Sequence, residues 1–180
     1  PAGINVFSTS GQYLRSLLKG GTSHIDYGID ASGNDVAFLI DSKYESNDKV
    51  AQTWRLDGAN GSQTVDQFKD MIGWSYHVST ANTAKPGWAI VTSDGAAIPS
   101  NYNWAPMWNH IFAVKLDGSG KIAPIANIHH ANSPLTVSWY ERNSFGGANR
   151  DLTAVIWGGT WGDADVSRPI HSFVARPKIQ

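Results

Sequence analysis

The chain has 180 residues, a formal net charge of −1 and a sequence pI of about 6.7. These values exclude nucleic-acid binding driven by a concentrated basic face, because that mode requires clustered Lys and Arg side chains. The sequence holds no cysteine and no apolar run near the roughly 18 residues of a membrane-spanning helix, which excludes disulfides, thiolate chemistry and a helical membrane anchor. This length predicts one domain, residues 1–180, with a substantial core.

The N-terminal segment is predicted to contain a short amphipathic helix over residues 12–19. Its apolar stripe consists of Tyr13, Leu14, Leu17 and Leu18. Ser10 is a candidate cap before this stripe, and Gly20-Gly21 is a stop signal after it. A second short helix with the same kind of stripe is predicted over residues 63–72.

Strand patterns recur at short spacing through the rest of the chain. The run HIDYGID (24–30) alternates cleanly, and VAFLID (36–41) is the continuous apolar run of a strand that is covered on both faces. Similar patterns follow at 50–56, 74–78, 88–92, 111–116, 135–142, 152–158 and 170–175. Turns rich in Gly, Asn and Asp separate them, and no internal repeat is evident. The sequence therefore predicts a mainly β protein, an antiparallel β-sandwich of about ten strands flanked by two short helices.

The segment IPSNYNWAPMWNH (98–110) concentrates rigid apolar surface without any charged side chain. Its prolines and asparagines favour a loop, and loops lie mostly on the surface. Exposed amphipathic rings suit membrane interfaces, sugar rings and choline-type cations alike. The candidate binding residues are Pro99, Tyr102, Trp104, Met107 and Trp108.

The other tryptophans divide into two groups. Trp54, Trp74 and Trp88 lie inside strand patterns and are expected in the core, where large aromatic side chains dominate. Trp157 and Trp161 flank a glycine-rich turn, and the sequence leaves open whether each is buried or exposed.

Signals of catalysis and metal binding are weak by comparison. His129 and His130 are adjacent, so on a strand they point to opposite faces and do not share a metal. Asp163 and Asp165 offer two carboxylates, whereas a calcium site needs six or more oxygens. Glu141 is a candidate half of a glycosidase pair whose second carboxylate we do not identify. We therefore predict no catalytic residue, no metal and no cofactor.

The pattern Pro99-x-Asn-Tyr102-Asn-Trp104-x-x-x-Trp108 resembles the lipid-binding segment of the actinoporins, a family of pore-forming toxins. The N-terminal segment followed by SHIDYGID (23–30) is similar to that family's N-terminal helix and the strand after it. The resemblance implies a β-sandwich flanked by helices and an aromatic loop that binds phosphocholine headgroups. It also implies that the N-terminal helix enters the bilayer as subunits oligomerise into a pore.

These features lead to one leading hypothesis and two alternatives. In the leading hypothesis the protein is a secreted, membrane-binding and pore-forming cytolysin, a monomer in solution that oligomerises on the target-cell membrane. The first alternative is a glycan-binding module, such as a lectin or a phage receptor-binding domain, in which the same aromatic rings stack on sugars. The second alternative is a carbohydrate-active enzyme that uses Glu141. Nucleic acid is not an expected partner.

Overall fold

The computed structural model describes residues 3–19, 24–42, 49–59, 62–67, 75–94, 107, 109–129, 144–162 and 169–179. This part of the chain forms thirteen strands and no helix. The strands are β1 (Gly3–Phe7), β2 (Tyr13–Lys19), β3 (His24–Ile29), β4 (Asp35–Ser42), β5 (Lys49–Arg55), β6 (Ser62–Gln67), β7 (Ser75–Ser79), β8 (Trp88–Asp94), β9 (His110–Lys115), β10 (Ile122–Asn127), β11 (Gly146–Ala148), β12 (Val155–Gly159) and β13 (His171–Ala175). The prediction of a mainly β, antiparallel protein is confirmed.

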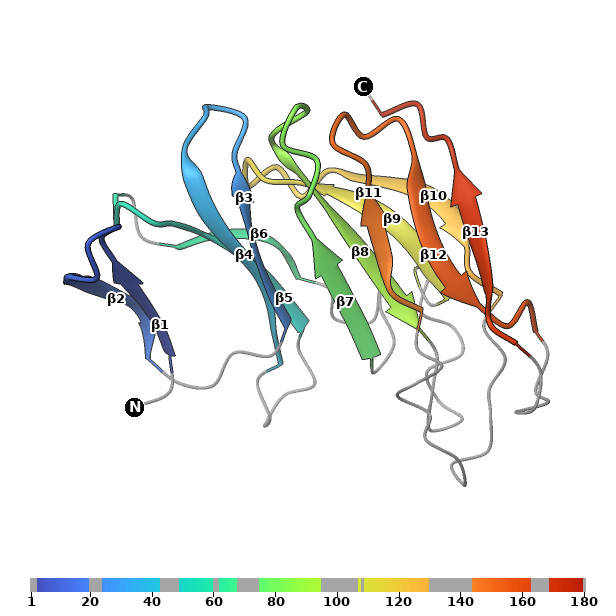
Figure 1. Cartoon of the computed structure of the whole chain (residues 1–180), viewed down its shortest axis with the longest axis horizontal. Helices are drawn as coiled ribbons and strands as arrows, with labels where there is room; N and C mark the ends of the chain where they lie inside the picture. Colours follow the sequence, from blue (N-terminus) through green and yellow to red (C-terminus); the bar gives the residue numbers. More distant parts are fainter. Residues whose placement is uncertain are drawn as a thin grey trace.

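The strands form four antiparallel sheets that follow one another along the chain: β1–β2, β3–β6, β7–β10 and β11–β13. Within each sheet, hydrogen-bonded neighbours are consecutive in sequence, so every sheet is an up-and-down meander. The sheets stand side by side across the molecule in chain order (Figure 1). The first strands of successive sheets contact each other, β3 with β7 and β7 with β11. The sheets therefore form a row in which β3, β7 and β11 link one sheet to the next.

This arrangement distributes the strands over four sheets instead of the two packed sheets that we predicted for a sandwich. The period-2 pattern indicates that a strand has two different faces, but it does not specify which sheet the strand joins. The two complete meanders, β3–β6 and β7–β10, also constitute a structural repetition that was not evident in the sequence. Each of them carries a histidine in its first strand, His24 and His77.

The two predicted helices are not present in the described residues. Residues 13–19, which include Tyr13, Leu14, Leu17 and Leu18, are strand β2 and pair with β1. The first part of the second predicted helix, 63–67, belongs to strand β6, and residues 68–72 lie outside the described residues. The reason is tertiary, because a helix this short is marginal by itself. Pairing with β1 satisfies the backbone of β2 and brings Leu17 against a buried cluster that contains Ile4.

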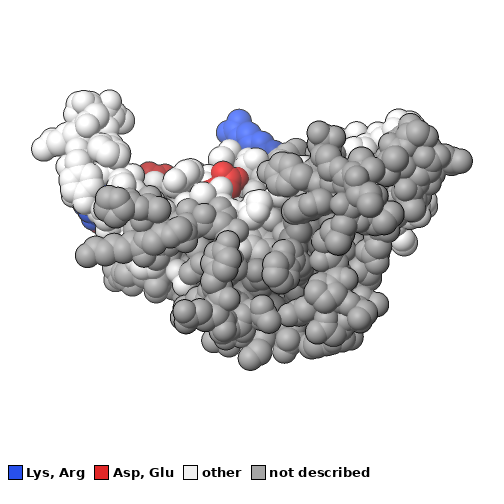
Figure 2. Space-filling model, turned by 90° about the horizontal axis from the view of Figure 1, so that it is seen from below, with Lys and Arg blue, Asp and Glu red and all other residues white. Residues whose placement is uncertain are grey.

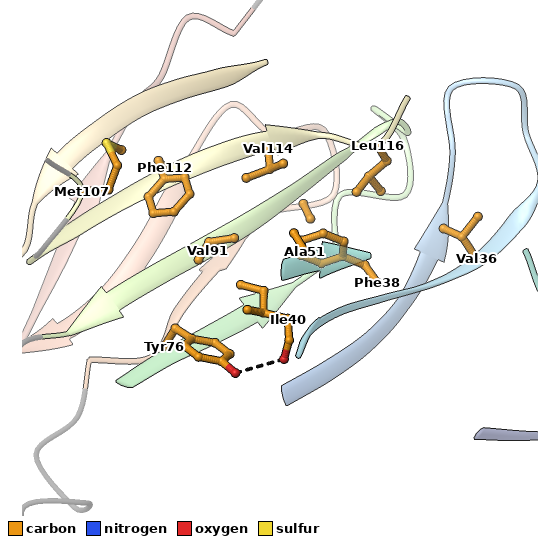
Figure 3. Close-up of a cluster of buried hydrophobic side chains, with 11 residues drawn as sticks. Val36, Phe38, Ile40, Ala51, Tyr76, Val91, Met107, Phe112, Val114 and Leu116 are labelled. Atoms are coloured by element: carbon orange, nitrogen blue, oxygen red, sulfur yellow. Dashed lines mark hydrogen bonds between the residues drawn. The ribbon is translucent and has the colours of Figure 1, made fainter. Parts of the chain in front are cut away.

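Three hydrophobic clusters fill the spaces between successive sheets. The cluster between β3–β6 and β7–β10 contains Val36, Phe38, Ile40, Ala51, Tyr76, Ala89, Val91, Met107, Phe112, Val114 and Leu116 (Figure 3). Within it, the Tyr76 hydroxyl donates a hydrogen bond of 3.0 Å to the carbonyl oxygen of Ile40. The next cluster joins β7–β10 to β11–β13 through residues such as Ile111 and Val155, and the third joins β1–β2 to β3–β6 through Ile4 and Leu39.

Strand β4 shows why the sequence there is continuously apolar. Val36, Phe38 and Ile40 face the cluster shared with β7–β10. Ala37 and Leu39 face the opposite cluster, which β1–β2 covers. All five side chains are fully buried. The prediction that this strand is covered on both faces is confirmed.

Candidate functional site

The predicted aromatic loop is described at one of its five candidate residues. Pro99, Tyr102, Trp104 and Trp108 lie outside the described residues. Met107 is 7% exposed and packs in the cluster between β3–β6 and β7–β10, near Phe112 (Figure 3). Its thioether side chain therefore belongs to the core and attaches this part of the chain to the sheets.

Several strands begin or end at the lower edge of the sheets in Figure 1. Strand β8 ends there at Asp94 and β9 begins there at His110, so the aromatic segment 98–110 connects two strand ends at this edge. Strand β12 also ends at the lower edge, and β11 and β13 begin there. In the view from this side, the described residues that are visible include a few acidic and basic side chains among uncharged ones (Figure 2).

Three large apolar side chains are exposed where the sheet β11–β13 meets the lower edge. They are Phe145, just before β11, Trp161, just after β12, and Ile170, just before β13, with exposed fractions of 50%, 57% and 45%. Several large apolar side chains exposed near neighbouring strand ends are candidate contacts for a ligand or partner.

Trp161 belongs to a row of four rings, which we call the Trp161 ladder. From the core outwards, the ladder consists of Trp157, Phe173, Trp161 and His129. Trp157 is buried, and its ring stacks on Phe173 with centroids 5.8 Å apart and planes inclined by 30°. Phe173 stacks in turn on Trp161 at 4.9 Å and 28°. The His129 ring lies 4.3 Å from that of Trp161. The ladder thus connects the hydrophobic core to the exposed indole.

The backbone at the outer end of the ladder is held in an uncommon conformation. Trp161 has a φ of 53° and His129 a φ of 48°, the left-handed region that non-glycine residues seldom adopt. The two turns are joined, because the Gly162 amide donates a hydrogen bond to the carbonyl oxygen of His129. The His129 amide donates to the side-chain oxygen of Asn127 at 2.8 Å. Such conformations persist only where the surroundings determine them, and they concentrate at functional sites.

A second group of rings lies on the first strands of successive sheets. The rings of His24 in β3 and His77 in β7 are 4.6 Å apart, and Phe145 lies 3.9 Å from His77. Burial, with the charge of His24 as a smaller cause, lowers the pKa of His77 to about 4. His77 is therefore neutral at physiological pH and does not act as a cation.

The described residues contain no group of three or more His, Cys, Asp or Glu side chains that could hold a metal ion. Nor does this part of the chain contain a helix of the length and hydropathy needed to cross a bilayer. Of the weaker candidates, His130, Glu141, Asp163 and Asp165 lie outside the described residues.

The tryptophans predicted from strand patterns are placed as follows. Trp88 is buried, Trp54 is half-buried, and Trp74 lies outside the described residues. The sequence left Trp157 and Trp161 open, and the structure buries the first and exposes the second. Sequence reasoning missed His24 and His77. The signal that could have found them is a histidine in the first strand of two successive meanders.

Comparison with known proteins provides no assignment: no protein-family model, curated protein or solved structure matches the chain.

Proposed function

We propose that this protein binds carbohydrate, with the outer end of the Trp161 ladder as its contact surface. The observation that carries the proposal is that Trp161 is 57% exposed although its backbone and ring are both held in place. An exposed aromatic ring that is already ordered loses little conformational entropy when a ligand covers it. The apolar C–H face of a sugar ring packs on such a surface, and this contact needs no charge.

Polar groups at the rim of the ladder suit the hydroxyl groups of a sugar. His129 and His171 are both exposed, and the His171 ring lies 6.5 Å from that of Phe173. Imidazole nitrogens can donate or accept hydrogen bonds according to their protonation. An apolar platform with a few polar groups beside it is the usual composition of a small-molecule site. The protein would meet such glycans outside the cell, so secretion stays part of the proposal.

The test is a glycan array followed by titration calorimetry on the best ligand. The variant Trp161→Ala should weaken binding at least about tenfold, as truncation of an anchoring aromatic does at other interfaces, while the melting temperature changes little. Ile156→Ala is the matched control, since Ile156 is equally exposed but lies on the β12 strand itself. If no glycan binds, or if Trp161→Ala binds as well as the parent protein, the proposal is wrong.

Membrane binding is the second candidate, favoured by three exposed apolar side chains next to the ends of strands β11, β12 and β13: Phe145, Trp161 and Ile170. Tryptophan is enriched at membrane interfaces, and the predicted aromatic segment connects strand ends at the same edge. The pore-forming step implied by the actinoporin resemblance has a higher cost, because β2 would have to leave β1 and refold as a helix.

Vesicles separate the two candidates. Co-flotation with phosphatidylcholine vesicles that is lost in Ile170→Ser, together with an empty glycan array, would favour the membrane candidate. Dye leakage from the same vesicles would in addition support pore formation. Absence of flotation at any lipid concentration would eliminate this candidate and leave the carbohydrate proposal unaffected.

A further inference from the structure

A cavity of about 370 Å³ lies between strand β2 and the end of strand β5. In this region the sheet β1–β2 packs against the sheet β3–β6. The cavity is lined by Leu14–Leu17, Trp54, Arg55 and Gly58. Its volume falls in the range of small-molecule sites in proteins. Two of the lining residues, Arg15 and Arg55, are cationic and none is acidic.

The two guanidinium groups differ in how they are paired. Arg55 is held by Asp57, with Nε donating to Oδ1 at 3.1 Å and Nη2 donating to Oδ2. Asp30 also acts on Arg55 through its charge, but it does not line the cavity. The Arg15 guanidinium, in contrast, has no hydrogen-bond or ion-pair partner among the described residues, although its charge acts weakly on Asp57.

Asp57 does not neutralise both cations. The hydrogen bond from Arg55 is the main cause that lowers the pKa of the Asp57 carboxyl, and the charge of Arg15 is the smallest. One carboxylate therefore serves mainly one guanidinium. The cavity retains an excess positive charge at Arg15.

Gly58 explains how the Arg15 side chain is positioned. This glycine has a φ of +75°, and its amide donates to the carbonyl oxygen of Arg55 at 3.0 Å in the turn after β5. A Cβ atom at this position would overlap Nη1 of Arg15 and lie 3.1 Å from its Cδ. The absence of a side chain thus allows the guanidinium to lie directly against the turn.

Three apolar side chains, Leu14, Leu17 and Trp54, share the cavity wall with Ser16, whose hydroxyl already donates a hydrogen bond to Oδ1 of Asn5 at 2.6 Å. The indole N–H of Trp54 already donates to the side-chain oxygen of Gln52 at 2.9 Å, so the ring offers mainly its apolar surface. Leu14 is 48% exposed, whereas Leu17 packs against the buried cluster that contains Leu39. A flat apolar body would fit against these side chains.

From these contacts we infer that the cavity binds a small organic carboxylate that carries a flat ring. A guanidinium presents parallel N–H donors that match the two oxygens of a carboxylate, and Arg15 is the group that provides them. Trp54 and Leu14 contribute the apolar contact for the ring. The site is independent of the Trp161 ladder, which lies on the sheet at the other end of the row (Figure 1).

The experiment uses benzoate as the probe, with benzamide as its neutral isostere and acetate as a carboxylate without a ring. Binding is measured by titration calorimetry on the whole chain at neutral pH. Benzoate should bind at least about tenfold more tightly than either comparator, because only benzoate engages both the guanidinium and the apolar wall. Equal affinity for benzamide, or no benzoate binding at all, would overturn the inference. Acetate that binds as tightly as benzoate would overturn the requirement for a ring.

Variants identify the residue responsible. Arg15→Gln should abolish measurable benzoate binding, and Arg15→Lys, which keeps the charge but loses the planar fork, should weaken it several-fold. Arg150→Gln is the matched control, since Arg150 is an exposed arginine in the turn between β11 and β12. Trp161→Ala should leave benzoate binding unchanged, so that failure of the carbohydrate proposal and failure of this one give different results. An Arg15→Gln protein with the parent's melting temperature and the parent's affinity would exclude Arg15 as the ligand contact.

Discussion

Two regions of the sheet β11–β13 contain the same types of apolar residue but differ in whether these are buried. One is its interface with the sheet β7–β10, and the other is its lower edge. At the interface, Val155 and Trp157 pack against Ile111 and are buried. At the edge, four residues after Trp157, the chain turns and leaves Trp161 more than half exposed. The comparison teaches that an apolar side chain stabilises the fold only where a second sheet covers it. Elsewhere it is surface that is available for binding.

The two tryptophans give the largest expected contrast. Trp157→Ala should lower the free energy of unfolding by about 3–5 kcal/mol, because it leaves a cavity between two sheets. Trp161→Ala should cost less than about 1 kcal/mol, since most of the ring is already in water. Denaturant unfolding monitored by circular dichroism measures both. Equal losses would mean that the ladder is structural throughout, and the carbohydrate proposal would lose its basis.

The pH dependence of stability probes the contact between strands β3 and β7, where the rings of His24 and His77 meet. His77 has a pKa of about 4 in the folded protein, lowered mainly by burial from the 6.5 of an exposed histidine. Between these two pH values the unfolded chain binds more protons than the folded protein. The contribution of neutral His77 to the free energy of unfolding is therefore fully present above pH 6.5 and is lost as the pH falls towards 4. The loss should approach about 3 kcal/mol, since each pKa unit corresponds to about 1.4 kcal/mol.

The comparison for this prediction is His77→Gln, which removes the titrating group and retains polar atoms. Its unfolding free energy should vary much less between pH 6.5 and 4 than that of the parent protein. His24, which lies beside His77, is retained in both proteins. Parallel pH profiles for the two proteins would show that His77 is not desolvated.

Two neighbouring glycines sharpen the contrast between covered and uncovered faces. A Cβ at Gly146 would lie 2.9 Å from Cδ1 of Ile111 and would overlap the hydroxyl of Thr92. A Cβ at Gly147, on the other face of β11, would meet nothing closer than the Ser79 hydroxyl at 3.8 Å. Gly146→Ala should therefore destabilise the protein by about 1–3 kcal/mol through overpacking.

Gly147→Ala should change the stability by less than about 0.5 kcal/mol, as is usual for a substitution that meets no close contact. Thermal unfolding of the pair checks this. If Gly147→Ala were the more damaging of the two, the assignment of the covered face of β11 would have to be reversed.

Local pattern and tertiary structure contributed differently at each element. The alternation in HIDYGID and the apolar run at 36–40 predicted strands that the structure contains, because alternation follows from strand geometry itself. The stripe at 13–18 failed, since seven residues with several apolar positions suit either a helix or a paired strand. For Trp157 and Trp161, the sequence left open which would be exposed, and the structure decided it.

By itself, the sequence determined that this protein is built from short antiparallel strands, that the strand at 36–40 is covered on both faces, and that no disulfide stabilises it. Only the tertiary structure decided that the strands separate into four stacked meanders, that Arg15 meets Gly58 across two sheets, and that Trp157 and Trp161 have opposite environments. The physical reason is the distance along the sequence over which each effect acts. Alternation and turn propensity act between neighbouring residues, whereas the surface that covers a given face is supplied by strands far away in the sequence.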